Sequence, residues 1–327
     1  MIIEIRAKNC FVFEEEISFS MKADMRNKKF ASNVHRENNF NVLKTVGVYG
    51  PNNVGKTCLV KCIRAIKHVL LDKKSGLVPN IFSDNEVCQL GVTFLAYGRK
   101  FSYDFWYNAK TNEYVYESFS EMLKDHYGNE KEVNWLKRDT INDVYYCTDE
   151  DVQAMMAIIS KNNLFCYLVD ISKFECLKEM KDILVGFAEK IDIINMNNIP
   201  MKHTIELMKN RNNLQEKIVE FIKNADLYMD DFKYVDVDNI QVKASDEEER
   251  PEEKALDIPE NMRDQIRLVS TYKGVHVPSM LFDSTGTKKI AAIASYVIEA
   301  LEEGRFLVVD ELDSSIHFKL TRAIVAL

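Results

Sequence analysis

A glycine-rich stretch in the N-terminal part of the chain has residue types and a spacing that suit phosphate binding. Its pattern is Gly-x-x-x-x-Gly-Lys-Thr, in which backbone N–H groups and the start of the next helix face the phosphates. Lys56 is expected to reach the β- and γ-phosphates, and the Thr57 hydroxyl is expected to bind Mg²⁺. Asn53 suits a left-handed backbone angle, which asparagine tolerates better than most residues. We therefore predict an ATP site at Gly50, Asn52, Asn53, Val54, Gly55, Lys56 and Thr57.

A second stretch with suitable chemistry lies near the C-terminus, where Asp283-Ser284-Thr285-Gly286-Thr287-Lys288-Lys289 precedes a predicted helix. Ser284 to Thr287 form a small, polar, glycine-containing helix start, which is a second place for an anion. Any capped helix looks similar, so this stretch taken alone indicates little.

A third stretch, residues 305–311, follows directly and reads as a continuous apolar strand that ends in two carboxylates. This is the pattern of a buried parallel strand beside the strand of a phosphate loop. Asp310 is expected to meet the Mg²⁺, directly or through water. Glu311 is expected to polarise a water for attack on the γ-phosphate. Two solvated polar residues are the alternative, and the phosphate loop in the same chain disfavours it.

Predicted strands and helices flank the three stretches and position their side chains. An apolar strand over residues 44–49 leads into the glycine-rich loop, and a helix over residues 56–74 leaves it, ended by Gly76. A second helix begins near Lys288 with apolar residues at helical spacing, and Gly304 closes it before the strand at residues 305–311.

The remaining pattern divides the chain into three parts, residues 1–120, 121–265 and 266–327. Period-two alternation predicts two strands in residues 1–20, a loop over residues 21–41, and an antiparallel meander over residues 87–116. A mainly helical lobe follows, with helices over residues 151–159, 177–191 and 207–224 and a strand over residues 235–242. The acidic run at residues 245–254 reads as a solvated loop, and residues 266–277 resume strand character.

Composition restricts the class of protein further. The 327 residues are 46% hydrophobic and 29% charged, and no apolar run approaches the roughly 18 residues needed to cross a membrane. No signal peptide is visible, so we expect a cytoplasmic protein whose seven cysteines are reduced and mostly packed in the core. The net charge of −8 argues against a surface that coats nucleic acid, although 43 Lys and Arg permit a local basic groove.

The order of the three motifs resembles that of ABC-type ATPases. Within that class the chain is similar to stand-alone bacterial AAA-family ATP-binding proteins of abortive-infection and anti-phage systems, relatives of OLD-family ATPases and, more distantly, of SMC and recombination-repair ATPases. The specific resemblance lies in residues 50–57, 284–289 and 310–317, whereas residues 5–9, 162–165 and 224–226 resemble family positions less specifically. It implies an α/β fold of the P-loop NTPase class and ABC type, with a mixed sheet, an antiparallel meander and an inserted helical lobe.

The resemblance also implies a mechanism. Such ATPases dimerise head to tail, with ATP held between the phosphate loop of one subunit and the Ser-x-Gly helix of the other. Ser284, the N–H of Gly286 and Thr287 would then contact the γ-phosphate in trans. The loop through Asp313 to His317 would cross the interface and sense the partner site. ATP binding would close the dimer and hydrolysis would open it.

Partners follow from the same resemblance. It implies a homodimer or higher homo-oligomer that serves as the sensor or scaffold of a nuclease or toxic effector. A nucleic acid or a phage component would act as the trigger, and no membrane is involved.

Four departures from the family pattern affect these expectations. Thr285 stands where glycine or an acidic residue is usual, and Phe11 lies near a position where the family often has arginine that contacts the base. Gln89 is the candidate for the glutamine that lines the metal in ABC proteins. The family's later strand, ending in Thr-His, has no counterpart after His317, so the chain is expected to bind Mg·ATP but hydrolyse it weakly unless His317 acts in trans.

Other functions stay open at this point. A nucleotide-gated scaffold with little turnover fits the missing histidine, while the intact Asp310-Glu311 pair favours an ATPase. An SMC-like DNA-repair ATPase would need a long coiled-coil insertion, and no heptad run of sufficient length occurs between residues 120 and 280. A P-loop kinase or GTPase would not explain residues 284–287 before Asp310.

Overall fold

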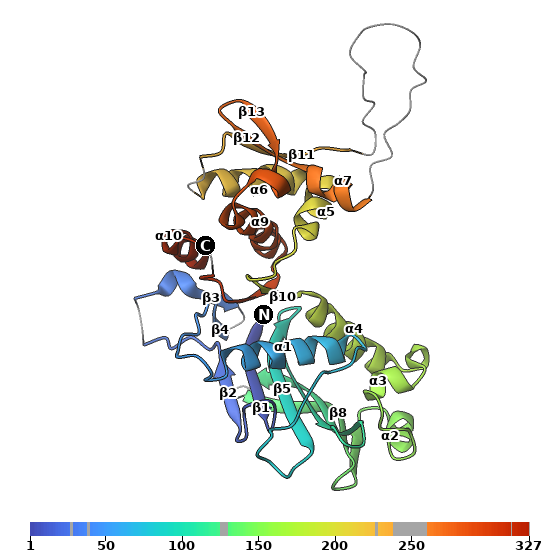
Figure 1. Cartoon of the computed structure of the whole chain (residues 1–327). Helices are drawn as coiled ribbons and strands as arrows, with labels where there is room; N and C mark the ends of the chain where they lie inside the picture. The colour runs from blue at the N-terminus through green and yellow to red at the C-terminus, as the bar shows by residue number, and fades with distance from the viewer. Residues whose placement is uncertain are drawn as a thin grey trace, which may run out of the picture. The chain divides into compact units, whose positions relative to one another are not determined.

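The computed structural model describes residues 1–26, 29–37, 40–124, 130–225, 228–237, 260–314 and 316–326. The chain divides into two compact units, Met1–Ile191 and Asp192–Leu327 (Figure 1). Within the described ranges, every helix is too short or too polar to cross a membrane.

The first unit is built on a seven-stranded antiparallel sheet with the strand order β2-β1-β5-β6-β7-β8-β9. Its strands are β1 (Ile2–Lys8), β2 (Ile17–Ser20), β5 (Val87–Ala96), β6 (Arg99–Asn108), β7 (Glu113–Lys124), β8 (Glu130–Asp139) and β9 (Val144–Cys147).

The meander expected from the sequence is confirmed. Strands β5 and β6 pair over their whole length, from Val87 opposite Asn108 to Ala96 opposite Arg99. The turn between them has positive φ angles of 52° at Tyr97 and 71° at Gly98, as two-residue hairpin turns require.

The prediction of a mainly helical lobe from residue 121 is wrong for residues 130–147, because the meander continues through β8 and β9. Aromatic contacts between strands explain the difference. The rings of Phe101 and Phe119 stack with centroids 5.3 Å apart, and Trp135 of β8 meets both edge-on. Such cross-strand packing overrides the helix propensity of the Lys and Glu residues in this segment. The three-part division of the chain stays a prediction.

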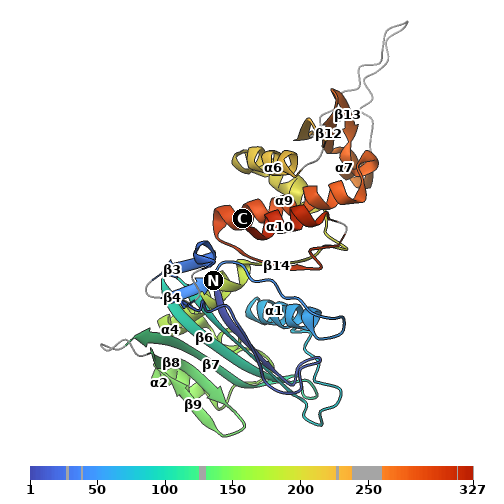
Figure 2. The ribbon, with the colours of Figure 1, turned by 90° about the vertical axis from the view of Figure 1, so that its left-hand side faces the viewer.

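Helices cover this sheet near its centre. Helix α1 (Lys56–Leu70) packs against α4 (Glu175–Glu189) and β5 (Figure 2). Phe187 of α4 stacks on Phe94 of β5 at 4.0 Å between ring centroids. Smaller elements complete the unit, namely α2 (Glu150–Met156), α3 (Phe165–Leu168) and η2 (Ile171–Lys173). The predicted helices at residues 56–74, 151–159 and 177–191 therefore exist with slightly different ends.

The segment before the phosphate loop differs from expectation in two ways. The predicted loop over residues 21–41 contains η1 (Ala31–Asn33) and an antiparallel hairpin of β3 (Val34–Glu37) and β4 (Phe40–Leu43). The predicted strand over residues 44–49 is wrong, since strand pairing ends at Leu43. The Asn33 side chain bonds the backbone N–H and C=O of Thr45 at 2.8 and 2.9 Å, which replaces a strand neighbour there. Residues 46–49 form no backbone hydrogen bonds with a neighbouring strand among the described residues.

The second unit surrounds the long helix α9 (Thr285–Glu303). Helices α5 (Lys202–Asn210) and α6 (Asn212–Asn224) pack on α9 beside a small sheet of β11 (Asp231–Tyr234), β12 (Leu268–Tyr272) and β13 (Val275–Pro278). The other elements are β10 (Ile191–Asn195), α7 (Glu260–Ile266), α8 (Ser279–Phe282), β14 (Phe306–Asp310) and α10 (Phe318–Ala326).

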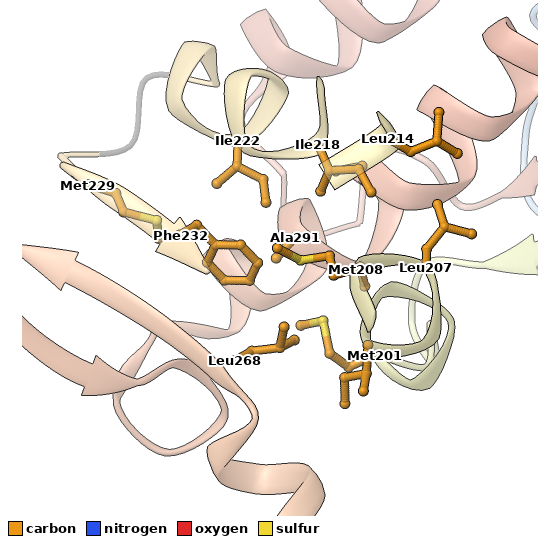
Figure 3. Close-up of a cluster of buried hydrophobic side chains, with 13 residues drawn as sticks. Met201, Leu207, Met208, Leu214, Ile218, Ile222, Met229, Phe232, Leu268 and Ala291 are labelled. Atoms are coloured by element: carbon orange, nitrogen blue, oxygen red, sulfur yellow. The ribbon is translucent and has the colours of Figure 1, made fainter. Parts of the chain in front are cut away.

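A cluster of buried apolar side chains joins several elements of this unit (Figure 3). Ile218 and Ile222 of α6 point toward Phe232 of β11 and Leu268 of β12, and all four are almost fully buried. The small side chain of Ala291 on α9 permits the close approach of these elements. The predicted helix at residues 207–224 is thus two helices, interrupted at Arg211.

Strands β10 and β14 form a parallel pair. Arg305, just before β14, bonds Asp192 near the start of β10, and the Met196 N–H donates to the Asp310 carbonyl at the other end. The strand predicted at residues 305–311 is therefore confirmed, although its side chains are half-buried rather than buried.

The other expectations for this unit have mixed outcomes. The helix closed by Gly304 is confirmed, and residues 266–277 form the hairpin of β12 and β13. Strand β11 lies before the predicted residues 235–242, of which residues 238–242 lie outside the described residues. The acidic run at residues 245–254 also lies outside them.

Candidate nucleotide site

The phosphate loop has the backbone conformation that its sequence predicts. Asn53 has a φ of 65° and Gly55 a φ of 97°, both in the left-handed region. Gly55 is the N-cap of α1, so Lys56 and Thr57 are the first two residues of that helix. The loop therefore presents the positive end of a helix of 15 residues, as a phosphate site requires.

Lys56 folds back across this loop. Its Nζ atom donates to the carbonyl oxygens of Gly50 at 2.7 Å and Pro51 at 2.5 Å. Both partners are neutral, so the ammonium keeps its net charge for an anion bound in the loop. Thr57 is exposed at the same end of α1.

Little space is left for other side chains in the loop. A Cβ atom on Gly55 would lie 3.0 Å from both Phe13 and Val12, and one on Gly50 would lie 3.3 Å from Val54. Val12 and Phe13, in the segment after β1, therefore pack closely against the phosphate loop at Gly55. The closely packed glycines, the left-handed backbone at Asn53 and Gly55, and the lysine over the loop together fit the phosphates of a nucleoside triphosphate.

The start of α9 in the second unit is a well-formed helix cap. The Ser284 Oγ atom accepts from the backbone N–H of Thr287 at 3.1 Å and lies 2.9 Å from the Thr287 hydroxyl. Ser284 and Thr287 are near the surface, and Gly286 lies between them in the first turn. This geometry fits an anion site, although it also satisfies an ordinary N-cap.

Asp283, which the sequence did not single out, fixes the residue before this cap. It is 7% exposed and accepts hydrogen bonds from Ser270 and Ser279, both at 2.6 Å, and from Tyr272 at 2.8 Å. Burial, together with the bond to Asp283, raises the pKa of Tyr272 to about 12. The loop that carries Ser284 is therefore anchored to β12 and α8.

The two predicted carboxylates stand at the end of β14. Asp310 is half-buried, and its Oδ2 atom accepts from the Asn195 side chain at 3.3 Å. Glu311 is exposed, has a φ of 57°, and accepts from the Asn197 side chain through Oε2. A positive φ at a non-glycine residue costs energy, so the fold holds Glu311 in this position against local preference.

The loop after Glu311 leads to the remaining predicted residues. Asp313 and His317 are both exposed, and Ile316 between them is buried. The His317 Nδ1 atom accepts from the Lys319 N–H at 3.3 Å, which places His317 at the start of α10. Lys289 of α9 donates to the Ser314 carbonyl at 3.4 Å, so α9 contacts this loop.

The predicted residues fall into two groups. Residues 50–57 belong to the first unit, while Ser284, Gly286, Thr287, Asp310, Glu311, Asp313 and His317 belong to the second. Gln89, the candidate metal-lining glutamine, lies inside β5 opposite Trp106. Assembly of these residues into one site stays a prediction. In the described ranges no three His, Cys, Asp or Glu residues cluster to hold a metal on their own. P-loop sites draw part of their metal ligands from the substrate phosphates.

Sequence reasoning missed Asn195 and Asn197, which contact the two carboxylates. The signal was present, because the apolar residues of β10 end in Asn195-Met196-Asn197-Asn198. Polar residues at the carboxyl end of a strand commonly line a site in α/β folds. The sequence analysis placed residues 192–198 within the mainly helical lobe and assigned no strand there, which concealed this signal.

Comparison with known proteins supports the family expectation for part of the chain. Residues 200–327 match the model of a family described as "AAA domain, putative AbiEii toxin, Type IV TA system". This match covers the start of α9 and the two carboxylates but not residues 50–57. The resemblance to AAA-family proteins of abortive-infection type is confirmed there, and the helices and strands of the structure are of the expected α/β class.

The chain was also compared with curated protein sequences and with solved structures. No curated protein matches the chain in sequence. Among solved structures, the SMC head domain from Thermotoga maritima is similar, with 12% identity and a TM-score of 0.44, over 99% of this chain and 85% of that one.

Proposed function

We propose that this chain is an ATPase that binds Mg·ATP at residues 50–57 and hydrolyses it. The observation that carries the proposal is the phosphate loop itself. The Lys56 ammonium lies over a loop with left-handed Asn53 and Gly55, at the start of α1. The AAA-family match over residues 200–327 supports the same reading.

Each residue then has a role set by its chemistry. Lys56 leaves its two carbonyl partners and pairs with the β- and γ-phosphate oxygens, where a charge-assisted bond is stronger. Thr57 and Asp310 would hold Mg²⁺, which when bound neutralises charge on the phosphates. Glu311 accepts the proton of the attacking water, and its exposure leaves it accessible to that water.

The proposed active state is a head-to-tail dimer. Ser284, the Gly286 N–H and Thr287 of one subunit would meet the γ-phosphate held by the other subunit. Asp313 and His317 would lie at the interface. The exposure of Ser284, Asp313 and His317 within their unit is compatible with this role.

The proposed biological role is that of a switch in a defence complex. The family description names a putative AbiEii toxin and a type IV TA system, and the motif order resembles ATPases that control a nuclease or toxin. In this role ATP-driven closure and opening would be transmitted to a separate effector protein.

The test is the release of phosphate from ATP by the purified chain, with and without Mg²⁺. Wild-type protein should turn over only with Mg²⁺, and Lys56→Ala should reduce the rate to background. Tight Mg·ATP binding without turnover would favour the nucleotide-gated scaffold instead. Absence of nucleotide binding would overturn the proposal.

A further inference from the structure

We propose that Asn197 is a positioning residue for Glu311 and couples it to the loop that follows. This inference rests on the proposed function, because it concerns the same carboxylate. Its evidence is a set of contacts that lies wholly within the second unit and involves Asn195, Asn197, Glu311 and Ser314.

Asn197 contacts Glu311 through its side-chain amide. The Asn197 Nδ2 atom donates to Glu311 Oε2, and the Ser314 hydroxyl donates to Asn197 Oδ1 at 2.5 Å. These two partners fix the orientation of the amide, because a carboxylate only accepts and the Ser314 hydroxyl needs an acceptor. This bond to Oε2 fixes the orientation of the carboxylate and leaves Oε1 available to accept a proton from water.

The segment that carries Asn197 is rigid. The Met196 N–H extends the β10–β14 ladder by bonding the Asp310 carbonyl at 3.0 Å, and the Met196 side chain is fully buried. The Asn197 N–H bonds Asn195 Oδ1 at 2.8 Å, which closes a tight turn. Asn195 in turn holds Asp310, so one turn contacts both carboxylates.

The hydrogen-bond donor to Glu311 is a neutral amide, that of Asn197. A lysine or arginine at this place would hold Glu311 as an ion pair and weaken it as a base. An amide orients the carboxylate with a single neutral hydrogen bond. Since Glu311 has an unfavourable φ of 57°, it needs such an outside contact to hold one conformation.

A further contact connects Glu311 to the proposed interface. Ser314 belongs to the loop that contains Asp313 and His317, and its carbonyl also accepts from Lys289 of α9. A displacement of this loop would pull the Ser314 hydroxyl from Asn197 and release Glu311. Correct orientation of the base is thereby linked to the conformation of the loop.

The kinetic test compares three variants of neighbouring residues. Asn197→Ala should lower kcat about tenfold to a hundredfold while the KM for Mg·ATP stays unchanged, as expected for a misplaced base. Asn197→Asp keeps the shape but loses the donor, so it should be no more active than Asn197→Ala. Asn198→Ala is the matched control, because Asn198 is exposed in the same turn and contacts neither carboxylate.

A second comparison separates positioning from general damage. In the Glu311→Gln background, Asn197→Ala should cause no further loss of kcat, since both changes act on one group. Equal rates for Asn197→Ala and Asn198→Ala, or a further loss in the Glu311→Gln background, would overturn the inference.

A measurement without turnover keeps this inference distinct from the proposed function. The side-chain amide signal of Asn197 in ¹⁵N NMR spectra should shift in Glu311→Ala and in Ser314→Ala, but not in Glu216→Ala, a change at an exposed position of α6. A signal that is unchanged in both contact variants contradicts the network. An inactive wild-type protein with the expected shifts would contradict the ATPase proposal alone.

Discussion

Asn53 and Gly55 set the geometry of the phosphate loop at the scale of single residues. Both adopt left-handed φ angles, which glycine and asparagine accept at lower cost than other residues. Lys56 and Glu311 then carry the two separable parts of the proposed chemistry, because one binds phosphate and the other activates water. Substituting each of them tests one part.

Lys56→Ala should weaken Mg·ATP binding by on the order of a hundredfold, because charge-assisted hydrogen bonds contribute about 1.5–3 kcal/mol. Titration calorimetry or fluorescent-nucleotide binding measures the effect. Lys44→Ala is the matched control, since Lys44 is exposed and lies outside the loop. Equal affinities for the two variants would remove Lys56 from the nucleotide site.

Glu311→Gln should leave nucleotide affinity unchanged and slow hydrolysis by on the order of a hundredfold or more, because an amide does not accept a proton from water. The variant should also accumulate as an ATP-bound dimer, detectable by light scattering after gel filtration. Glu216→Gln, at an exposed position of α6, serves as the control. A wild-type rate in Glu311→Gln would assign the base to another residue.

At the scale of elements, a buried ion pair fixes the loop at residues 160–165 against the sheet. Arg138 of β8 and Glu117 of β7 are fully buried and 3.1 Å apart. Arg138 also donates to the carbonyls of Ser160 and Asn163, and Glu117 accepts from the Phe165 N–H at 2.9 Å. This loop includes residues 162–165, which the sequence had placed among weaker family positions.

Arg138→Met should destabilise the protein by about 3–5 kcal/mol, because it leaves the buried Glu117 carboxylate without its charged partner. Chemical denaturation measures the loss. Arg99→Met is the matched control, since the Arg99 side chain is 37% exposed in its pairs with Glu121 and Glu179 and should contribute roughly 1 kcal/mol or less.

This prediction also has a pH dependence. Burial raises the pKa of Glu117 in the folded chain, and Arg138 opposes that rise. Without Arg138 the folded state binds a proton more readily than the unfolded state, so its stability increases as pH falls. The deficit of Arg138→Met should therefore shrink on acidification below neutral pH. A constant or growing deficit would contradict this account.

At the scale of the whole molecule, the proposed dimer would build each site from two subunits. Lys56 and Glu311 would act in the subunit that holds the nucleotide, and Ser284 would come from the other. A mixing experiment tests this arrangement directly, since a defect in one subunit can be complemented only by the correct residue of its partner.

Mixing inactive Lys56→Ala with inactive Ser284→Ala should restore about a quarter of the wild-type rate, because half of the dimers are mixed and each has one intact site. Mixing Lys56→Ala with Glu311→Gln should restore nothing, since both defects fall on sites of their own subunits. Steady-state ATPase rates after mixing give the result. Restoration in both mixtures, or in neither, would contradict the head-to-tail arrangement.

The sequence alone determined the local features of this protein. The phosphate loop, the cap at Ser284, the strand ending at Asp310 and the hairpin at Tyr97-Gly98 all follow from short patterns. Each depends on backbone conformation over a few residues, where glycine, asparagine and serine have strong preferences.

Only the tertiary structure decided the features that depend on distant partners. Trp135 of β8 meets the rings of Phe101 and Phe119 from other strands, which fixes β8 in the sheet, and β9 then pairs with β8. The Asn33 side chain bonds the backbone of Thr45 in place of a strand neighbour, and Asn197 meets Glu311 across more than a hundred residues of sequence. Such contacts arise from packing between segments far apart in the chain, which local residue preferences do not encode.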